Sequence, residues 1–171
     1  MILFKTIHKD YVSTWQDYQK TSSYRVGARW NSAEVPVMYA SSNAQNSMLE
    51  IANYMPKPSL VNKLFRLAVF EFPSLRLHKI EPGELPSNWY DSNKPNEPKA
   101  LGDKYLNSGK YDGIVVPSAT INRDVATHEV NAIRESVYAN VVVNLETIGL
   151  NNIKLIDSFA PVYSQSMFKS L

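Results

Sequence analysis

Hydrophobic and polar residues alternate in short runs along this chain, and such runs are typical of β-strands. We expect strands over residues 2–7, 35–40, 64–72, 75–80, 113–117, 137–145 and 153–156. Helices are expected over residues 10–20, 43–54, 98–108 and 128–137. Runs of short strands with a few helices between them indicate an α+β fold rather than a repeated β-α-β unit.

Some element boundaries are marked by residues with special backbone preferences. Asp10 suits a helix N-cap, and Pro98 suits the first turn of a helix. Pro36 places its strand at a sheet edge or itself near the strand start, because proline cannot donate to a β-ladder. The proline-rich stretch 81–98 is expected to be a long loop inside one domain, residues 1–171, since both of its flanks are needed to complete one core.

Composition and charge narrow the class of protein. Apolar residues make up 44% and charged residues 20% of the chain, which is typical of an ordered globular protein. A net charge of +2 without a basic cluster argues against direct binding of nucleic acid. The chain has no Cys, its three His are far apart, and no apolar run approaches the ~18 residues of a membrane span. A cytoplasmic protein with no metal site and no membrane contact is therefore expected.

Glu50 is a polar residue whose place in the fold the pattern leaves open. In the expected helix over 43–54 it lies nearly opposite the apolar positions and beside Asn46 and Ser47. The apolar positions of this helix are Ala44, Met48, Ile51, Ala52 and Met55. Most helical glutamates lie on a solvated face. The alternative is a carboxylate that faces a cleft, and helical spacing does not separate the two.

The stretch GARWNS, residues 27–32, places Arg29 beside Trp30 in a polar loop. The guanidinium could stack on the indole at the surface, or its planar donor fork could bind a phosphate. Gly27 would allow the backbone to approach a ligand closely. The chain contains neither a Walker loop nor a dinucleotide-binding glycine motif, so neither of these common motifs explains the stretch.

Tyr39 belongs to an expected strand, and Ser118 follows another. Tyr39 shares a strand face with Val35 and Val37, as a core tyrosine with its hydroxyl at the rim would. Ser118 comes after the buried strand 113–117, where sites are often built, although a turn serine that bonds its own backbone is the commoner case. No Gly-x-Ser-x-Gly motif surrounds Ser118, so a role as nucleophile is not expected.

Five segments of the chain, in their order and spacing, resemble one known family. They read GARWNS, VPVMYAS, MLEI, LPSNW and ALGDKYLNSGKYDGIVVPSA, and they extend over residues 27–119. This arrangement resembles the RES domain, a family named for an arginine, a glutamate and a serine. Those residues would be Arg29, Glu50 and Ser118 here, and VVVN, which ends at Asn144, resembles a later family segment.

The resemblance implies a fold similar to that of ADP-ribosyltransferase toxins and an enzyme that destroys NAD⁺. Family members are typically toxins of bacterial toxin–antitoxin pairs and are described as phosphorylases or hydrolases. Their usual partner is an Xre-type DNA-binding antitoxin that covers the active site. By this resemblance NAD⁺ is the substrate, inorganic phosphate is a candidate co-substrate, and no cofactor or metal is needed.

The family residues suggest how the nicotinamide–ribose bond would be cleaved. The transition state resembles an oxocarbenium ion and nicotinamide leaves as a neutral molecule, so the site needs negative charge rather than a general acid. Glu50 would supply that charge, and Arg29 would hold the pyrophosphate or an attacking phosphate. Tyr39 would stack on the nicotinamide ring, and Ser118 would position a ribose or a phosphate by hydrogen bonding.

Tyr24 and Asn144 are further pocket candidates, and the sequence departs from the family pattern at two places. The family often has Arg in its first strand, where this chain has Lys5, so a bidentate phosphate contact would become a point-charge contact. Residues 121–136 form a longer link than usual, and a lid, a partner-binding element or a simple elaboration would each account for it.

Other functions are compatible with the same residues. The fold relationship permits transfer of ADP-ribose to a protein or a nucleic acid, and an inert site would bind a nucleotide or a partner without catalysis. Within NAD⁺ cleavage, water and phosphate are both suitable acceptors. A phosphate acceptor needs nearby cations, and Lys5, Arg25 and Arg29 favour it slightly.

Overall fold

A computed structural model of the chain describes residues 1–55, 57–91, 96–164 and 166–167. One mixed sheet of seven strands has the order β4-β5-β6-β2-β1-β3-β7. The strands are β1 (Ile2–His8), β2 (Val37–Ser41), β3 (Phe65–Glu71), β4 (Leu77–Lys79), β5 (Gly113–Val116), β6 (Asn140–Asn144) and β7 (Lys154–Phe159). The helices are α1 (Ser22–Arg25), α2 (Ala44–Ala52), α3 (Pro58–Leu64), α4 (Asn96–Leu106), α5 (Asn131–Glu135) and α6 (Leu145–Ile148). Only the pairing of β4 with β5 is parallel among the described strands, so the expected α+β class is confirmed.

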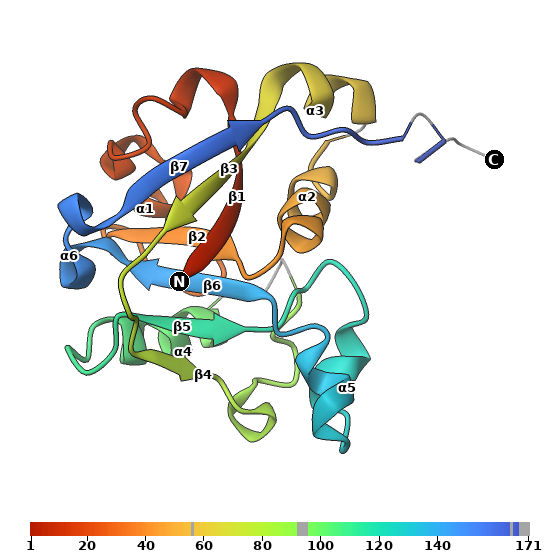
Figure 1. Cartoon of the computed structure of the whole chain (residues 1–171). Helices are drawn as coiled ribbons and strands as arrows, with labels where there is room; N and C mark the ends of the chain where they lie inside the picture. The colour runs from red at the N-terminus through yellow and green to blue at the C-terminus, as the bar shows by residue number, and fades with distance from the viewer. Residues whose placement is uncertain (56, 92–95, 165, 168–171) are drawn as a thin grey trace.

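The sheet divides between β1 and β2. β1 pairs with β3 along all seven of its residues, whereas its register with β2 is a single pair, Phe4 with Ser41. Beyond that pair the strands separate, and Figure 1 shows β1, β3 and β7 steeply inclined to β2, β5 and β6. The Lys5 ammonium donates to the Tyr39 carbonyl at 2.8 Å, so a side chain bonds a β2 oxygen where the two strands diverge.

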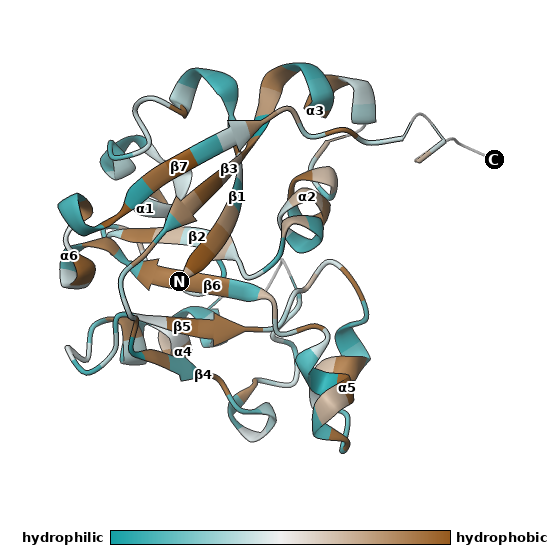
Figure 2. Cartoon of the chain, viewed as in Figure 1, coloured by the Kyte–Doolittle hydropathy of each residue, from teal (hydrophilic) through white to brown (hydrophobic). Residues whose placement is uncertain are grey.

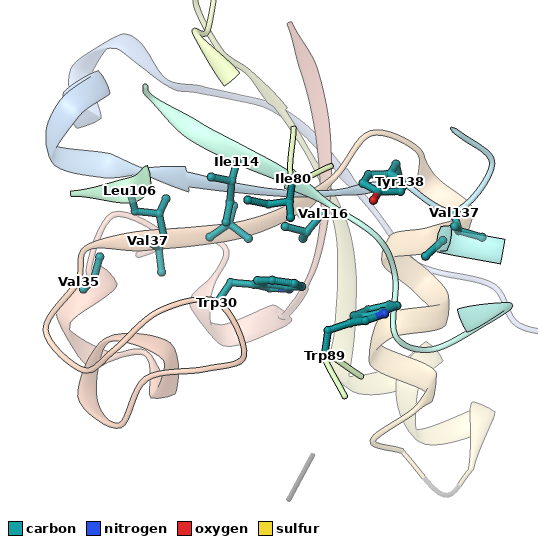
Figure 3. Close-up of a cluster of buried hydrophobic side chains, with 12 residues drawn as sticks. Trp30, Val35, Val37, Ile80, Trp89, Leu106, Ile114, Val116, Val137 and Tyr138 are labelled. Carbon is teal, nitrogen blue, oxygen red and sulfur yellow. The ribbon is translucent and has the colours of Figure 1, made fainter. Parts of the chain in front are cut away.

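Hydrophobic side chains pack on both faces of the sheet. One cluster, drawn in Figure 3, contains Trp30, Val35, Val37, Ile80, Trp89, Leu106, Ile114, Val116, Ala126, Val137, Tyr138 and Val142. The other contains Leu3, Met38, Ala40, Ala68, Phe70, Phe72, Val141, Val143, Leu145, Ile148 and Ile153. Figure 2 shows that β5 and β6 are largely hydrophobic. Successive residues of a strand face opposite sides, so a continuous apolar run such as that of β6 is buried on both faces.

The prediction of a helix over residues 10–20 is wrong. The segment holds two 3-10 turns, Lys9–Tyr11 and Tyr18–Lys20, joined by an irregular stretch. Asp10 lies inside the first turn rather than at a helix N-cap. The Trp15 ring packs edge-on against a buried aromatic ring of β3, with centroids 5.1 Å apart. Tyr11, Trp15 and Tyr18 recur at helical spacing, yet the packing of Trp15 keeps the segment against the sheet in an irregular path.

Helix α2 turns polar residues toward the sheet, opposite to the orientation that its apolar pattern predicts. Asn46 and Ser47 are buried, with 4% and 5% exposure. The Asn46 amide donates to Ser41 Oγ at 2.9 Å and to Asn140 Oδ1 at 2.6 Å. The Ser47 hydroxyl bonds that of Thr6 at 3.0 Å. Hydrogen bonds to three different strands therefore decide which face of α2 is buried, since buried polar groups need partners.

Two long connections, residues 128–137 and 81–98, were also the subject of predictions. The helix expected over 128–137 is reduced to the five residues of α5, and its expected apolar residues Val130 and Ile133 are 52% and 41% exposed. In the proline-rich stretch 81–98, positions 92–95 lie outside the described residues.

Helix α3 is an element that the sequence pattern does not predict. Pro58 occupies its first turn, where the missing N–H has no intrahelical partner to lose. Val61 is its buried residue. Like the other helices of the described residues, α3 is not long and apolar enough to cross a membrane.

Candidate active site

A cavity of about 510 Å³ opens where β1 and β2 separate, and its walls also include α2 and part of the GARWNS loop. Lys5, Arg29, Tyr39 and Glu50 line it, so four residues singled out in the sequence come together. They belong to two strands, a loop and a helix. The volume lies within the range of small-ligand sites, about 300–1,000 Å³.

Glu50 is held through one oxygen of its carboxylate. Its Oε1 accepts from the Ser118 hydroxyl at 2.8 Å and from Asn140 Nδ2 at 2.7 Å. Among the described residues Oε2 accepts no hydrogen bond, and the side chain lines the cavity. The carboxylate is thus fixed in orientation while it keeps an acceptor oxygen for a ligand. The interpretation of Glu50 as part of a solvated helix face is wrong.

Ser118 contacts Glu50 rather than the cavity. The serine is completely buried, with 0% exposure, and does not line the cavity. Its Oγ also accepts from the Thr120 N–H at 3.2 Å, as in a serine turn. The expectation that Ser118 bonds a ribose or a phosphate directly is corrected on this ground: buried behind Glu50, Ser118 is a positioning residue for that carboxylate.

Asn140, the first residue of β6, is a site residue that the sequence analysis misses. Its Nδ2 donates to Glu50, and its Oδ1 accepts from Asn46 Nδ2 at 2.6 Å. The side chain lines the cavity from the strand next to β2. The strand reads NVVVN, so a polar residue at either end is the available signal. Spacing alone does not say which end meets α2.

Tyr39 lines the cavity, and its hydroxyl bonds the GARWNS loop. The hydroxyl donates to Asn31 Oδ1 at 2.8 Å and accepts from the Trp30 N–H at 3.0 Å. Burial raises the pKa of Tyr39 above its usual range, so the phenol keeps its proton. The residue therefore joins the cavity to the loop as a neutral hydrogen-bonding group.

The GARWNS loop is held in place by α4 and by its own turn. Ser32 bonds Asp103 through its N–H at 2.9 Å and through its hydroxyl at 2.5 Å. Gly102 lets the helix touch the loop, because a Cβ there would overlap the Trp30 carbonyl. Gly27 has a φ of 78°, which glycine adopts without strain. The backbone around Arg29 is thus fixed from both sides.

Arg29 lines the cavity, and its guanidinium is tethered at one end. Nη1 donates to the carbonyls of Trp89 at 2.8 Å and Asp91 at 3.3 Å. Within the described residues Nε and Nη2 make no hydrogen bond, which leaves part of the donor fork for an anion. Trp30 is 2% exposed, and its ring stacks on Trp89 with centroids 6.3 Å apart (Figure 3), so surface stacking does not describe this Arg–Trp pair.

Lys5 is the second cation of the cavity. Its ammonium donates to the Tyr39 carbonyl, and an ammonium has three N–H groups. Burial lowers the pKa of Lys5 from 10.5 to about 8. An anion in the cavity can therefore accept from Lys5 and would favour its charged form.

Tyr24 and Arg25, which precede the GARWNS loop in the chain, do not line this cavity. Tyr24 packs edge-on against Tyr18, with ring centroids 5.4 Å apart, and does not line the cavity. Arg25 lines a neighbouring cavity instead. The assignment of Tyr24 as a pocket residue is therefore corrected, because Tyr24 lines neither of the two cavities.

Asn144 is corrected as well, because it lies at the opposite end of β6 from Asn140. Its Oδ1 accepts from the first backbone N–H groups of α6, and its Nδ2 donates to the Leu106 carbonyl at 3.0 Å. Strand residues rise ~3.3 Å each, so the two asparagines are separated by roughly 13 Å. Asn144 is a helix cap and does not line the cavity.

Two tyrosines at the cavity also escape the sequence analysis. Tyr54, which follows α2, is 72% exposed, and Tyr90 is 37% exposed. The Arg123 guanidinium lies over the Tyr90 ring, 4.4 Å from its centroid. The stretch 121–136 thus reaches a residue of the cavity wall, which a partner-binding element or a lid would do.

Comparison with known proteins gives a consistent result. The family model described as "RES domain" matches residues 2–145. A protein of Yersinia enterocolitica named "Toxin Res" is 26% identical over 122 residues, which cover 71% of this chain and 78% of that protein. A protein of Pseudomonas putida with the same name is 29% identical over 113 residues, which cover 63% of this chain and 73% of that protein.

Proposed function

Since the chain belongs to the RES domain family, we propose that it is the toxin of a bacterial toxin–antitoxin pair and that it destroys NAD⁺ by cleaving the nicotinamide–ribose bond. The two similar proteins named as toxins support the biological role. The observation that carries the chemistry is the Glu50 carboxylate, fixed by two donors through Oε1 in a cavity that also holds Lys5 and Arg29.

In the proposed reaction the bond between ribose C1′ and the nicotinamide nitrogen breaks, and its electron pair leaves with neutral nicotinamide. C1′ then bonds an oxygen of inorganic phosphate, or of a water molecule that releases a proton to solvent. Positive charge develops on the ribose, as in the oxocarbenium-like transition state of glycoside cleavage. Glu50 Oε2 stabilises this charge or bonds the ribose hydroxyls, while Ser118 and Asn140 keep the carboxylate from turning away. Preorganised charge of this kind costs no reorganisation during the reaction.

The remaining wall residues bind the rest of the substrate. Arg29 and Lys5 hold the pyrophosphate or an attacking phosphate, the first with a partly open donor fork and the second as a point charge. The Tyr39 ring contacts the cationic nicotinamide ring, a contact of about 1–2 kcal/mol when desolvated. Two cations in one cavity favour phosphate over water as the acceptor.

The proposed partner is an Xre-type DNA-binding antitoxin that covers the cavity. Exposed tyrosines at the cavity wall, Tyr54 and Tyr90, are side chains of the kind enriched at protein interfaces. Co-expression of the antitoxin is expected to restore both growth and the NAD⁺ level of a bacterium that expresses this chain.

Product analysis of the purified protein tests the chemistry. NAD⁺ is incubated with the protein, with and without inorganic phosphate, and nicotinamide, ADP-ribose and its 1-phosphate are quantified. Glu50→Gln keeps an acceptor for Ser118 and Asn140 but removes the charge, and we expect it to slow nicotinamide release by ~10²–10³-fold. Glu146→Gln, at an exposed position on α6, is the matched control and should leave the rate unchanged.

Three results would contradict the proposal. Nicotinamide release by Glu50→Gln at the wild-type rate would remove Glu50 from the reaction. A covalent ADP-ribose adduct on cell proteins or nucleic acids, in place of free product, would instead indicate a transferase. Binding of NAD⁺ without nicotinamide release would indicate a binding module.

A further inference from the structure

A second cavity, of about 540 Å³, adjoins the first. Lys5, Ser22 and Ser23 line both cavities, so the two meet at β1 and the start of α1. From there the second cavity extends along the irregular segment that follows β1 and the beginning of β2. Glu50 and Arg29 line the first cavity but not the second.

The walls of the second cavity suit a flat aromatic ring. Trp15 and Tyr18, both half-buried, line it, and each ring packs edge-on against a neighbour, Phe70 for the first and Tyr24 for the second. Buried Met38 lies among the lining residues of β2. Fixed aromatic rings over an apolar floor offer a base a stacking surface that loses little entropy on binding.

The charges of the second cavity are arranged for an anion at its junction with the first. Lys5 lies at the junction and Arg25 lines the second cavity, so cations are present on that side. The acidic side chain of this cavity, Asp17, is paired with Lys20 at 2.6 Å, which compensates its charge. Two adjoining cavities with a cation at their junction suit a ligand made of two nucleosides joined by a pyrophosphate.

We propose that the second cavity binds the adenosine half of the dinucleotide, with the pyrophosphate at Lys5 and the nicotinamide ribose at Glu50. Glu50 sets the orientation of the dinucleotide across the two cavities. The bond to be cleaved must lie beside Glu50, and Glu50 lines the first cavity but not the second. The inference rests on the proposed function, since it takes NAD⁺ as the substrate, and it assigns Trp15, Tyr18 and Arg25 to substrate recognition.

Comparison of NAD⁺ with nicotinamide mononucleotide, which lacks the adenosine half, tests the inference on the intact protein. Thr14 is exposed and lines the second cavity but not the first, so Thr14→Trp fills the second cavity. Neighbouring Ser13 is exposed and lines neither cavity, so Ser13→Trp is the matched control. We expect Thr14→Trp to lower kcat/KM for NAD⁺ by about 5- to 100-fold, as for the loss of one stacked base. Cleavage of the mononucleotide, and both activities of Ser13→Trp, should be unchanged.

Binding of AMP gives a second readout, which does not depend on catalysis. By calorimetry, AMP should bind the wild type and Ser13→Trp with similar Kd and bind Thr14→Trp about 5- to 100-fold more weakly. The Trp15 indole signal in NMR spectra should shift when AMP is added.

The two experiments separate failure of the inference from failure of the proposed function. If Thr14→Trp slows both substrates equally or neither, the inference is overturned while NAD⁺ cleavage stands. If AMP does not bind the wild type, or binds Thr14→Trp with unchanged Kd, the inference is wrong whether or not NAD⁺ is cleaved. AMP binding that Thr14→Trp weakens, without cleavage of NAD⁺, supports the adenosine site and overturns the proposed reaction.

Discussion

Ser118 and Asn140 donate to the same oxygen of Glu50, and they come from different parts of the chain, the loop after β5 and the first residue of β6. The family resemblance identifies Glu50 and Ser118 but predicts the serine inside the cavity, where the structure does not place it. It misses Asn140, because a hydrogen bond between residues 90 positions apart leaves no local pattern. At the residue scale, the sequence predicts which residues belong to the site but not which residues they contact.

The two asparagines of β6 provide a prediction with an internal control. Asn140→Ala should lower kcat for nicotinamide release by about 10- to 100-fold, because a hydrogen bond to a charged group is worth ~1.5–3 kcal/mol. Asn144→Ala should leave kcat unchanged and lower the free energy of unfolding by ~1–2 kcal/mol, because it removes a helix cap. Steady-state kinetics and urea unfolding of both variants check this. Equal loss of kcat in the two variants would contradict the assignment of Asn140.

Lys5 predicts a pH dependence in which the sign can be derived. Burial lowers its pKa to about 8, so the folded chain releases this proton at a lower pH than the unfolded chain, where the value is 10.5. The unfolded state then binds more protons between these values, and the free energy of unfolding should rise with pH there. Binding of an anionic substrate should weaken over the same pH range, because the Lys5 ammonium loses its proton and its charge.

The measurement is KM for NAD⁺ between pH 7 and pH 9.5, with Lys5→Arg as the comparison. Arginine stays charged over this range, so the KM of Lys5→Arg should be nearly constant while that of the wild type rises above pH 8, the value at which burial places the Lys5 pKa. A wild-type KM that does not change with pH would count against Lys5 as a phosphate-binding residue.

At the scale of elements, the strands and α4 were predictable because each has a local signal, an apolar run or a proline at a helix start. The orientation of α2 and the path of residues 9–20 were not. α2 has an apolar stripe, yet its buried residues Asn46 and Ser47 are polar because partners on β1, β2 and β6 accept or donate their hydrogen bonds. Helical periodicity reports amphipathicity, but distant partners decide which side is covered.

The contact between α4 and the GARWNS loop predicts the effect of a single methyl group. A Cβ at Gly102 would overlap the Trp30 carbonyl, whereas one at Gly83 would meet nothing within 4 Å. Gly102→Ala should lower the free energy of unfolding by ~1–3 kcal/mol through overpacking, and Gly83→Ala should change it little. Gly102→Ala should also lower kcat/KM, because the displaced Trp30 N–H bonds the Tyr39 hydroxyl. Chemical denaturation of both variants gives the comparison, and similar stabilities would exclude this contact as a constraint on the loop.

At the scale of the whole molecule, one ion pair joins the segment before β4 to the residue before β5. Arg76 donates to Asp112 through Nε at 3.1 Å and Nη2 at 2.7 Å, and through its backbone N–H at 2.8 Å. These bonds hold the pKa of Asp112 below its ordinary value of 3.8. The stability they contribute is present above pH 3.8 and is lost as the pH falls through the lowered pKa.

Asp112→Asn should therefore reduce the free energy of unfolding at pH 7, and its difference from the wild type should shrink as the pH falls below 3.8. Asp124→Asn, at an exposed position, should match the wild type at every pH. Urea unfolding as a function of pH measures both. A difference for Asp112→Asn that stays constant at low pH would show that shape, rather than charge, matters at this position.

The sequence by itself determined the α+β class, most strands, the family and the residues of the candidate site that carry charge, because apolar periodicity and short motifs are local properties of the chain. Only the tertiary structure decided that β1 and β2 diverge at Lys5, that Asn140 rather than Asn144 reaches Glu50, and that a second cavity adjoins the first. These features depend on hydrogen bonds and packing between segments far apart in the chain. Their free energy is set by partners that no local window of sequence contains.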